Sequence, residues 1–492
     1  MKRPLFAAAL CLVALTAVRV AAGNADRTRD GYIRAEQLEG GENLLVTGQV
    51  YRKDASSVYI KSVIISDPAV RSELPEVSAS GQSAQTSGQQ NQIQNHAGGY
   101  RCQDYFICET EEAMEIPLGS VIMAEGIFAP FSHGTNPGEF DAAVYYRTLE
   151  IGGKLRKAQL LGKSESCWPF RESLFQLKCR LKERLYRILP EKEAAVMSAL
   201  LLGDKSEMDS DTKDLYERNG ILHILSISSL HITIIGMSVY KLLRRIRLPV
   251  LPAALGGSVL LLLYGCLTGF GVSACRAIGM YLIKMLGEAA GRTYDMLTAL
   301  GVMGAIMVLR NPYYLESSGF LLSYASVLGI GILYPALAPE PPGFLQKAEK
   351  EKNIFAKAGD SVYQSFFVSL CITLTTLPVQ LWFYYEIPVY SVFLNLFVIP
   401  LMKPMMIAGI IALGVPGLEW LSIINYGILQ GYSFLCGCFD RLPFHTWNPG
   451  CPRVWQIVVY YGLLLGAAGW NYRVKQKEKF PERFSRKFIA GR

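Results

Sequence analysis

The sequence predicts a polytopic α-helical membrane protein of about ten spans that carries a small exported β-barrel. Of the 492 residues, 51% are hydrophobic and 18% are charged, whereas soluble globular domains carry about 25% charged residues. Long apolar runs recur after residue 220, and alternating apolar and polar residues occupy much of the region before residue 157. The first two observations predict the membrane bundle, and the third predicts the barrel.

Apolar runs close to the bilayer-crossing length of about 20 residues account for most of the predicted spans. They occupy residues 4–22, 221–241, 249–270, 294–309, 318–337, 361–383, 388–414, 416–438 and 454–470. A further run at 275–290 contains Arg276, Lys284 and Glu288. Charges inside an apolar run predict either a strained span or a re-entrant segment that lines a cavity.

Lys and Arg residues predict the orientation of the spans, because cytoplasmic loops carry an excess of them. They cluster at 1–3, 241–247, 347–352 and 473–488. An even number of spans with both termini in the cytoplasm places every cluster inside, and residues 23–200 then lie outside the cytoplasm. The net charge of +8 therefore reflects topology more than an acidic partner. We expect a multi-pass protein of the cytoplasmic membrane that ends in a basic cytoplasmic tail at 473–492.

The first run, residues 1–22, has a basic start, an apolar stretch and a small-residue end. This pattern predicts either a transmembrane anchor or a cleaved signal-like segment. Both alternatives export the residues that follow.

Residues 40–156 predict the exported domain. Strand-like alternation occurs at 43–66, 120–131 and 142–156, and roughly five or six short strands suit a small barrel, of which the OB-fold is one candidate. Residues 77–99 are rich in Gln, Ser and Gly, a composition that predicts a disordered insertion. Cys102 and Cys108 are a candidate disulfide in an oxidising compartment, with a pair of free thiols as the alternative.

Residues 168–192 predict an amphipathic helix that lies in the membrane interface. One face is an apolar stripe of Leu174, Leu177, Leu181, Leu185 and Ile188. The other carries the basic residues Lys178, Arg180, Lys182, Arg184 and Arg187. That basic face is either solvated beside lipid headgroups or a contact for the phosphates of a passing polyanion.

The stretch GILHILSISSLHITIIG, residues 220–236, is apolar enough for a membrane helix yet carries two histidines and three serines. A Ser–His hydrolase needs a third group that orients the base, and no Asp or Glu lies between Glu217 and Glu288. On one helix, His223 and His231 would lie roughly 12 Å apart, too far to share a metal ion. Eleven cysteines without a C-x-x-C pair also argue against a zinc module.

Two interpretations of this polar stripe remain open at the level of composition and spacing. Ser and His side chains form hydrogen bonds between membrane helices, where small residues allow close approach. They also line water-filled paths, because polar groups inside a membrane face a cavity or the bundle interior.

Several other segments lie before and after this stripe in the sequence. MSALLLGDK (197–205) leads into the stripe; CRAIGM (275–280), NPYYLESSGFLLSYASVLGI (311–330) and FLNLFVIPLM (393–402) come after it; and NPGEFDAAVYYRTLEI (136–151) lies upstream. From about residue 40 to residue 435, these segments resemble the ComEC competence channel family. The upstream segment is similar to the turn that closes the exported OB-like domain of that family.

The resemblance implies a channel domain at 195–472 that passes single-stranded DNA across the cytoplasmic membrane during natural transformation. It implies single-stranded DNA and membrane lipid as partners, together with a surface DNA receptor and a cytoplasmic DNA-translocating ATPase, and it implies no cofactor. The chain departs from the family at Ser229, where Gly is usual. It also lacks the His-x-His-x-Asp-His motif of the C-terminal metallo-β-lactamase-like domain, so we expect a channel without visible nuclease residues.

A conduit for DNA needs donors or cations for the phosphates and aromatic surfaces for the bases. The candidate channel-lining or DNA-contacting residues are His223, Ser226, Ser228, His231, Arg276, Arg292, Glu316, Ser323 and Asn395. Of the stripe, we expect His231 and Ser228 to face the path. The candidate turn of the exported domain is Asn136, Pro137, Gly138 and Asp141, and residues 382–393 supply aromatic rings. We predict no catalytic residue and no metal site.

Purely structural roles remain open for some of these residues. Arg276 is also placed to snorkel toward the membrane surface, and the aromatic segment also suits an interfacial belt. Two other functions are alternatives to the channel. One is a membrane-embedded hydrolase or lipid-modifying enzyme that uses His223, His231 and Glu316. The other is a membrane-anchored receptor whose barrel binds a ligand.

Overall fold

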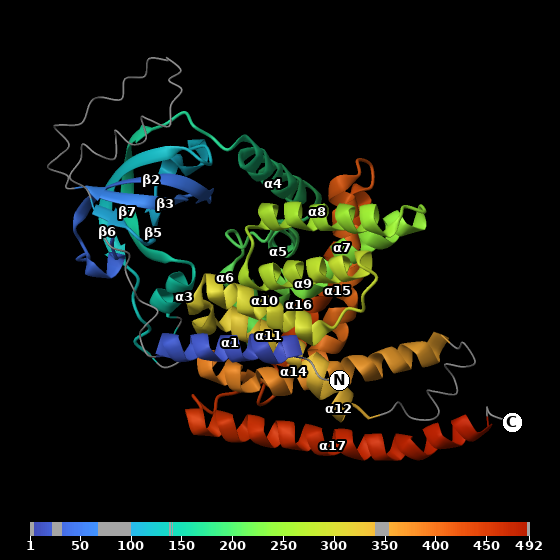
Figure 1. Ribbon diagram of the computed structural model, residues 1–492. Helices are drawn as coiled ribbons and strands as arrows, with labels where there is room; N and C mark the ends of the chain where they lie inside the picture. Colours follow the sequence, from blue (N-terminus) through green and yellow to red (C-terminus); the bar gives the residue numbers. More distant parts are fainter. Residues whose placement is uncertain are drawn as a thin grey trace. The chain divides into compact units, whose positions relative to one another are not determined.

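The computed structural model describes residues 4–21, 32–66, 100–136, 139, 141–339 and 354–489. The insertion expected at 77–99 and the basic loop at 347–352 lie outside these residues. The chain divides into two units (Figure 1). The barrel unit comprises Leu15–Leu177 and Asn311–Ser317, and the bundle unit comprises Met1–Ala14, Lys178–Arg310 and Ser318–Arg492.

Seven strands form the sheet of the barrel unit, and five of them close into a ring. The strands are β1 (Tyr32–Ile33), β2 (Asn43–Lys53), β3 (Ser57–Ser66), β4 (Tyr100–Cys102), β5 (Tyr105–Glu109), β6 (Val121–Pro130) and β7 (Ile151–Lys163). β2 pairs antiparallel with β3 and β6, β3 with β5, and β6 with β7. A parallel pairing of β5 with β7 closes the ring. A small five-stranded barrel of this kind is the OB architecture, so the predicted barrel is confirmed.

Alternation of side chains along these strands supplies the core of the barrel. Val50, Val58 and Ile60 are fully buried, and each is followed or preceded by a residue that faces outward. Gly153 of β7 lies against the Phe128 ring, where an added Cβ would come within 2.3 Å of the ring. A side chain at position 153 would therefore displace the aromatic core.

A buried ion pair joins the barrel to the helix that follows it. Lys53 is only 4% exposed and donates to the Ile116 carbonyl at 2.8 Å and to the Glu172 carboxylate at 2.9 Å. Glu172 lies in the first turn of α4 (Pro169–Ile188) and also accepts from the Leu118 N–H at 2.9 Å. α4 lies within residues 168–192, where the leucine stripe predicts a helix. Its location in a membrane interface stays a prediction.

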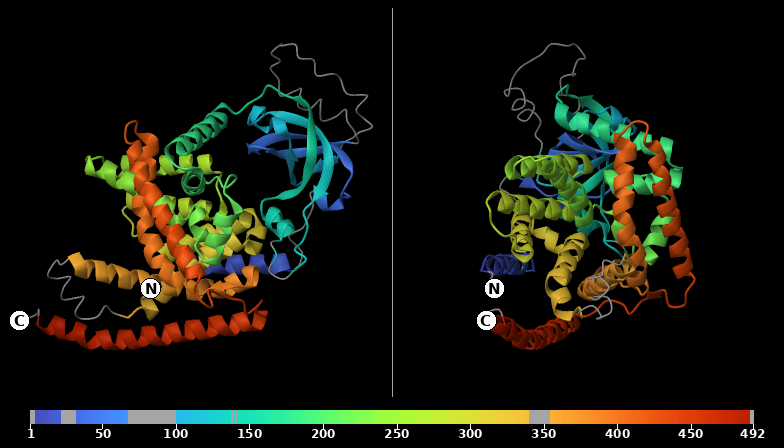
Figure 2. Two further views of the ribbon diagram at one scale, coloured as in Figure 1. Left: turned by 180° about the vertical axis from the view of Figure 1, so that it is seen from behind. Right: turned by 90° about the vertical axis from the view of Figure 1, so that its right-hand side faces the viewer.

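The bundle unit is helical. Among the described residues its helices include most of α1 (Pro4–Ala21), followed by α5 (Glu191–Leu202), α6 (Ser210–Arg218), α7 (Ser229–Arg245), α8 (Val250–Thr268), α9 (Val272–Ala289), α10 (Met296–Arg310), α11 (Ser318–Leu328), α14 (Ile354–Tyr384), α15 (Ser391–Gly414), α16 (Ser422–Asp440) and α17 (Val454–Ile489). A π-helical turn, Gly329–Leu333, joins α11 to α12 (Tyr334–Leu337). α15 and α16 lie side by side as a hairpin (Figure 2).

Four helices among the described residues are long and apolar enough to cross a membrane: Val250–Thr268, Ser318–Leu337, Gly359–Tyr384 and Ser391–Gly414. Pro4–Val18 and Met296–Arg310 are apolar but shorter. The structure thus supports a helical membrane protein, and it does not confirm the count of ten spans. The interrupted run at 275–290 falls within α9, one continuous helix.

Two glycines, Gly236 and Gly257, allow close packing of α7, α8 and α9. The Tyr281 hydroxyl of α9 donates to the Gly236 carbonyl of α7 at 3.1 Å. A Cβ at Gly236 would lie 2.4 Å from Leu261 Cδ1 of α8 and 2.8 Å from the Tyr281 ring, and a Cβ at Gly257 of α8 would lie 2.4 Å from the Tyr281 hydroxyl. Glycine at both positions is what lets the three helices meet, as at other close crossings of membrane helices.

Candidate functional site

The polar stripe of residues 220–236 does not lie on one helix, so that expectation is wrong. Gly220 adopts a left-handed φ of +71°, and a short 3₁₀ turn occupies Leu222–Leu225. Ser226 and Ser228 have extended backbones, and α7 begins only at Ser229. The physical reason is a helix cap, which apolar spacing does not reveal.

Ser228 and His231 form that cap. The Ser228 hydroxyl accepts from the Leu230 N–H at 3.2 Å. The Nδ1 atom of His231 lies 3.1 Å from the Ser228 N–H, which donates to it, and 2.8 Å from the Ser228 hydroxyl. This is a capping box in which histidine takes the place usual for Glu or Gln.

The cap fixes which nitrogen of His231 carries the proton. Because the Ser228 N–H can only donate, Nδ1 is an acceptor and the neutral ring is protonated on Nε2. His231 is fully buried, and its Nε2 has no hydrogen-bond partner among the residues that the structure describes. An unpaired buried donor costs about 1–3 kcal/mol, so this N–H calls for an acceptor from elsewhere.

The other two members of the stripe are satisfied locally. His223 is exposed, and its Nδ1 lies 3.0 Å from the Gly220 carbonyl oxygen. The Ser226 hydroxyl donates to the His223 carbonyl at 2.9 Å, so its proton is not directed at an imidazole. The structure therefore brings together Ser228 and His231 but does not pair Ser226 with His223 as nucleophile and base.

Arg276 of α9 is the second buried group with unmet hydrogen bonds. It is 3% exposed, and its Nε and Nη1 atoms have no partner in the described part of the chain. A guanidinium stays charged under all physiological conditions. Its Cζ lies 6.0 Å from the centre of the Tyr324 ring, the outer limit of a cation–π contact.

Tyr324 of α11 is a neighbour of Arg276 that sequence reasoning missed. It stacks on Phe320 with ring centres 4.2 Å apart, and it reaches α10 at Gly304, where an added Cβ would lie 3.1 Å from its ring. The i, i+4 spacing of Phe320 and Tyr324 was visible in the sequence, but their position beside a cation depends on how α9, α10 and α11 pack.

The remaining channel candidates are dispersed. Asn395 of α15 has a buried Oδ1 without a partner in the described ranges, while Ser323 of α11 is partly buried. Arg292 is exposed on the turn after α9, roughly 20 Å along the helix from Arg276. Glu316 lies in a 3₁₀ turn, Pro312–Glu316, that clusters with the barrel unit.

The motif LLGDK contains an acid, Asp204, with a structural role. Asp204 accepts from Lys182 of α4 at 3.0 Å and from the Ser206 hydroxyl at 2.7 Å. Burial raises the pKa of Asp204, but the hydrogen bonds from Ser206 and Lys182 outweigh burial and lower the pKa to about 2. Its charge is thus committed to holding α4 against the end of α5, and part of the basic face of α4 is paired.

In the barrel unit, the turn candidates lie between β6 and α3 (Ala142–Thr148). Asp141 caps α3 by accepting from the Val144 N–H at 2.9 Å, and Asn136 is exposed in the preceding loop. Pro137 and Gly138 lie outside the described residues.

Cys102 and Cys108 are both buried and are free thiols in the structure. The register of β4 and β5 on β3 places Cys108 opposite Val58, and it places Arg101, the neighbour of Cys102, opposite Ile64. A disulfide requires Cα atoms within about 7 Å, so bridging this pair would require the two strands to move.

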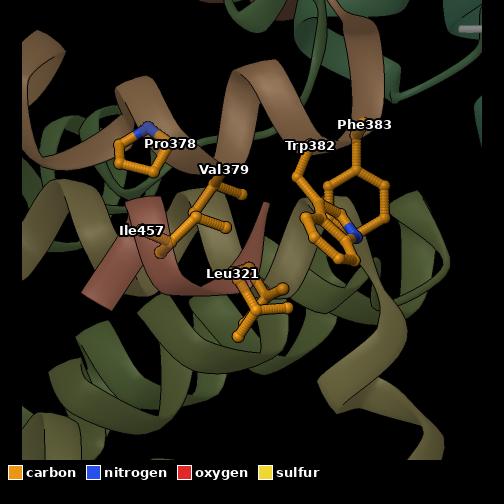
Figure 3. A pocket seen from close by; sticks show the side chains of 7 residues that line it. Leu321, Pro378, Val379, Trp382, Phe383 and Ile457 are labelled. Carbon is orange, nitrogen blue, oxygen red and sulfur yellow. The ribbon is translucent and has the colours of Figure 1, made fainter. Parts of the chain in front are cut away.

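The aromatic segment contributes to an apolar cavity of about 220 Å³ between α11, α14 and α17 (Figure 3). The lining residues are Leu321, Pro378, Val379, Trp382, Phe383, Val454 and Ile457. Such a lining offers almost no polar partner, so the cavity differs from the surroundings of His231 and Arg276, which offer donors to an anion.

A family model and three curated relatives match parts of the chain. Residues 200–473 match the family model described as Competence protein. No solved structure matches the chain.

Three curated relatives are similar to parts of the chain. ComE operon protein 3 of Bacillus subtilis is 24% identical over 346 residues, which are 70% of this chain and 42% of the relative. Recombination protein 2 of Haemophilus influenzae is 21% identical over 377 residues, 68% of this chain and 45% of the relative. An uncharacterized protein of Aquifex aeolicus is 27% identical over 146 residues, 29% of this chain and 34% of the relative. The chain thus spans less than half the length of each.

Proposed function

The chain belongs to the competence protein family, and on that premise we propose that it is a membrane channel for the uptake of single-stranded DNA across the cytoplasmic membrane during natural transformation. Among the buried donors without a partner in the described part of the bundle unit, two nitrogen donors carry the proposal: the Nε2–H of His231 and the guanidinium of Arg276. A phosphodiester backbone offers oxygen acceptors and negative charge at every nucleotide. A strand in transit supplies what these groups lack.

Burial of both groups is consistent with a channel at rest. His231 and Arg276 are shielded from solvent, so a strand reaches them only after the helices around them separate. A cytoplasmic membrane also requires a closed state, because a permanently wet path would dissipate ion gradients.

The proposal includes a topology and partners. About ten spans place both termini in the cytoplasm and residues 23–200 outside it. A surface receptor delivers the strand, and a cytoplasmic DNA-translocating ATPase draws it inward, because the chain shows no G-x-x-x-x-G-K-[ST] loop of its own. Membrane lipid surrounds the bundle, and transport is the role assigned to the chain.

The experiment is DNA uptake in a deletion strain complemented with the full chain. Labelled DNA is followed separately at the cell surface and in the cytoplasm. We expect the deletion to retain surface binding and to lose cytoplasmic label, and complementation to restore it. Unchanged entry in the deletion strain would refute the channel.

Topology is tested with single cysteines introduced into a cysteine-free variant. A cysteine at Asn136 should react with a membrane-impermeant maleimide in intact cells, and one at Arg473 should react only after permeabilisation. Labelling of position 136 from the cytoplasm alone would overturn the proposed orientation.

A further inference from the structure

A cluster of aromatic side chains covers the outer face of the barrel, on strands whose inner face is the core. Tyr51 of β2, Tyr59 of β3 and Tyr105 of β5 each adjoin a fully buried residue, namely Val50, Val58 and Phe106. Successive side chains of a strand point to opposite faces. The three tyrosines therefore project outward together, and each is partly exposed.

The rings are in mutual contact. The Tyr51 centroid lies 5.3 Å from that of Tyr105 and 6.3 Å from that of Tyr59, within the range of aromatic pairs. The Arg52 guanidinium lies 4.6 Å from the Tyr59 centroid, and Asp54 holds it there through a contact of 3.2 Å. The Arg52 side chain keeps 53% of its surface exposed, so a cation and three rings share one accessible face.

The connection between β6 and β7 extends this face. Phe131 stacks on Tyr146 of α3 with centroids 3.9 Å apart, and Tyr145, 46% exposed, lies 5.2 Å from Tyr146. Arg52 interacts electrostatically with Tyr145, and Tyr59 with Tyr146. The rings of the strands and the rings of α3 are thus neighbours.

The position of this cluster on the barrel indicates a binding face. β2, β3, β5, β6 and β7 are the five barrel strands in chain order, so the cluster occupies the first three strands and the connection between the last two. In OB-folds, the face of strands 2 and 3 and the loops between strands 1 and 2 and between strands 4 and 5 bind oligonucleotides and oligosaccharides. A cover formed only to shield the sheet would use aliphatic residues equally well and would not need an exposed cation.

We infer that the face of Tyr51, Tyr59, Tyr105 and Arg52 binds unpaired nucleobases by stacking, with Arg52 contacting the phosphates. This inference rests on the proposed function and adds a binding site outside the bundle. Aromatic rings stack on any base, which gives binding with little sequence preference. Double-stranded DNA hides the base faces, so the site selects a single strand.

The test uses the full chain in lipid nanodiscs and a fluorescent dT oligonucleotide. Loss of one stacking ring weakens binding by roughly five-fold or more, so Tyr59→Ala and Tyr105→Ala should each raise the Kd by at least that factor. Tyr59→Phe and Tyr105→Phe keep the rings and should stay within about two-fold of the parent. Tyr100→Ala removes an exposed tyrosine of β4, 67% exposed, and serves as the matched control.

An abasic oligonucleotide of the same length isolates the stacking. The parent should bind it more weakly than dT, and Tyr59→Ala should cause no further loss on it. Arg52→Gln should weaken both oligonucleotides and reduce the dependence of binding on salt.

Several results would overturn the inference. One is equal affinity of the Tyr→Ala variants and the parent for dT, and another is an equal loss of affinity for abasic and dT strands in Tyr59→Ala. Tighter binding of duplex DNA than of dT, or displacement of dT by a glucose oligosaccharide, would also overturn it. None of them touches the proposed function, which the cellular uptake experiment tests. Conversely, if DNA entered a strain that lacks the chain as well as it enters the parent strain, the channel would be refuted. Oligonucleotide binding by the barrel would be unaffected by that result.

Discussion

The backbone N–H of Ser228 donates to the Nδ1 atom of His231 at 3.1 Å, so this imidazole caps the helix that carries it while presenting Nε2–H to the bundle interior. Because the side chain has these two roles, different substitutions of His231 can remove one role or both. The cap needs an acceptor on the side chain, whereas the proposed contact with a DNA phosphate needs the Nε2–H donor.

His231→Leu removes both tasks, and His231→Gln keeps an acceptor suited to a capping box. We expect His231→Leu to reduce DNA entry by roughly ten-fold or more, the effect of about 1.4 kcal/mol, with normal abundance in the membrane. His231→Gln should retain the thermal stability of the parent and still lower entry, because its amide does not reproduce the position of Nε2–H. Cytoplasmic label per molecule of protein is the measurement. Normal entry in the His231→Leu/Ser228→Ala double variant would show that the pair is structural.

Arg276→Met should lower DNA entry without lowering the stability of the protein. Replacing a buried, unpaired charge with an apolar side chain of similar length removes a desolvation cost, so the thermal unfolding midpoint should stay level or rise. DNA entry should fall by roughly ten-fold or more, since the buried cation is lost. Arg453→Met, at an exposed position outside the candidate residues, is the control and should change neither quantity. A lower midpoint with unchanged entry would mark Arg276 as a structural residue.

Gly236→Ala should destabilise the bundle by about 1–3 kcal/mol, the usual cost of overpacking. Its Cβ would lie 2.4 Å from Leu261 Cδ1 and 2.8 Å from the Tyr281 ring, and both residues are buried. Gly427→Ala is the matched control, because a Cβ there meets nothing within 4 Å and alanine favours a helix. Scanning fluorimetry of both variants compares them, and equal midpoints would contradict the close packing of α7 and α8.

Glu172→Leu should destabilise the barrel unit by about 3 kcal/mol, because Lys53 is then left buried without its carboxylate. Adding Lys53→Met to this variant removes the stranded charge and should recover more than half of the loss. The unfolding midpoints of the single and double variants measure the coupling. Equal midpoints for the two variants would show that the pair contributes nothing.

Deletion of residues 77–99 should leave expression and DNA entry nearly intact. The pairing of Ile65 with Tyr100 places the ends of the intervening chain about 5 Å apart, so residues 67–76 suffice to join them. Membrane abundance and cytoplasmic label are compared with those of the parent. Loss of the protein on deletion would show that the segment contributes to folding.

Local patterns predicted the barrel well and the bundle less completely. Alternation along β2 and β3 is a property of each strand alone, and a buried residue such as Val58 beside an outward Tyr59 follows directly from it. Apolar length identified α8, α11, α14 and α15 for the same reason. These features need no knowledge of distant residues.

The errors concern interactions that spacing does not encode. The start of α7 depends on the capping hydrogen bonds of Ser228 and His231, and apolar periodicity continues through it unchanged. The surroundings of Arg276 depend on Tyr324, which is 48 positions away in the chain and becomes a neighbour only through packing at Gly304. The order of family motifs located Arg276 and Asn395 as candidates, but only the structure shows that Arg276 Nε and Nη1 and Asn395 Oδ1 are buried without a partner among the described residues.

The contact of Tyr281 with Gly236 has a mechanical consequence. The Tyr281 and Leu261 side chains fill the space beside these glycines, and dense packing transmits displacement. We therefore expect α7, α8 and α9 to move together, so that the separation of His231 and Arg276 stays constant when the bundle rearranges. The rearrangement would then fall to the helices around them. Of these, α14 contains Pro378, and α15 contains Pro400 and Pro404; proline lacks the N–H that a helical hydrogen bond needs.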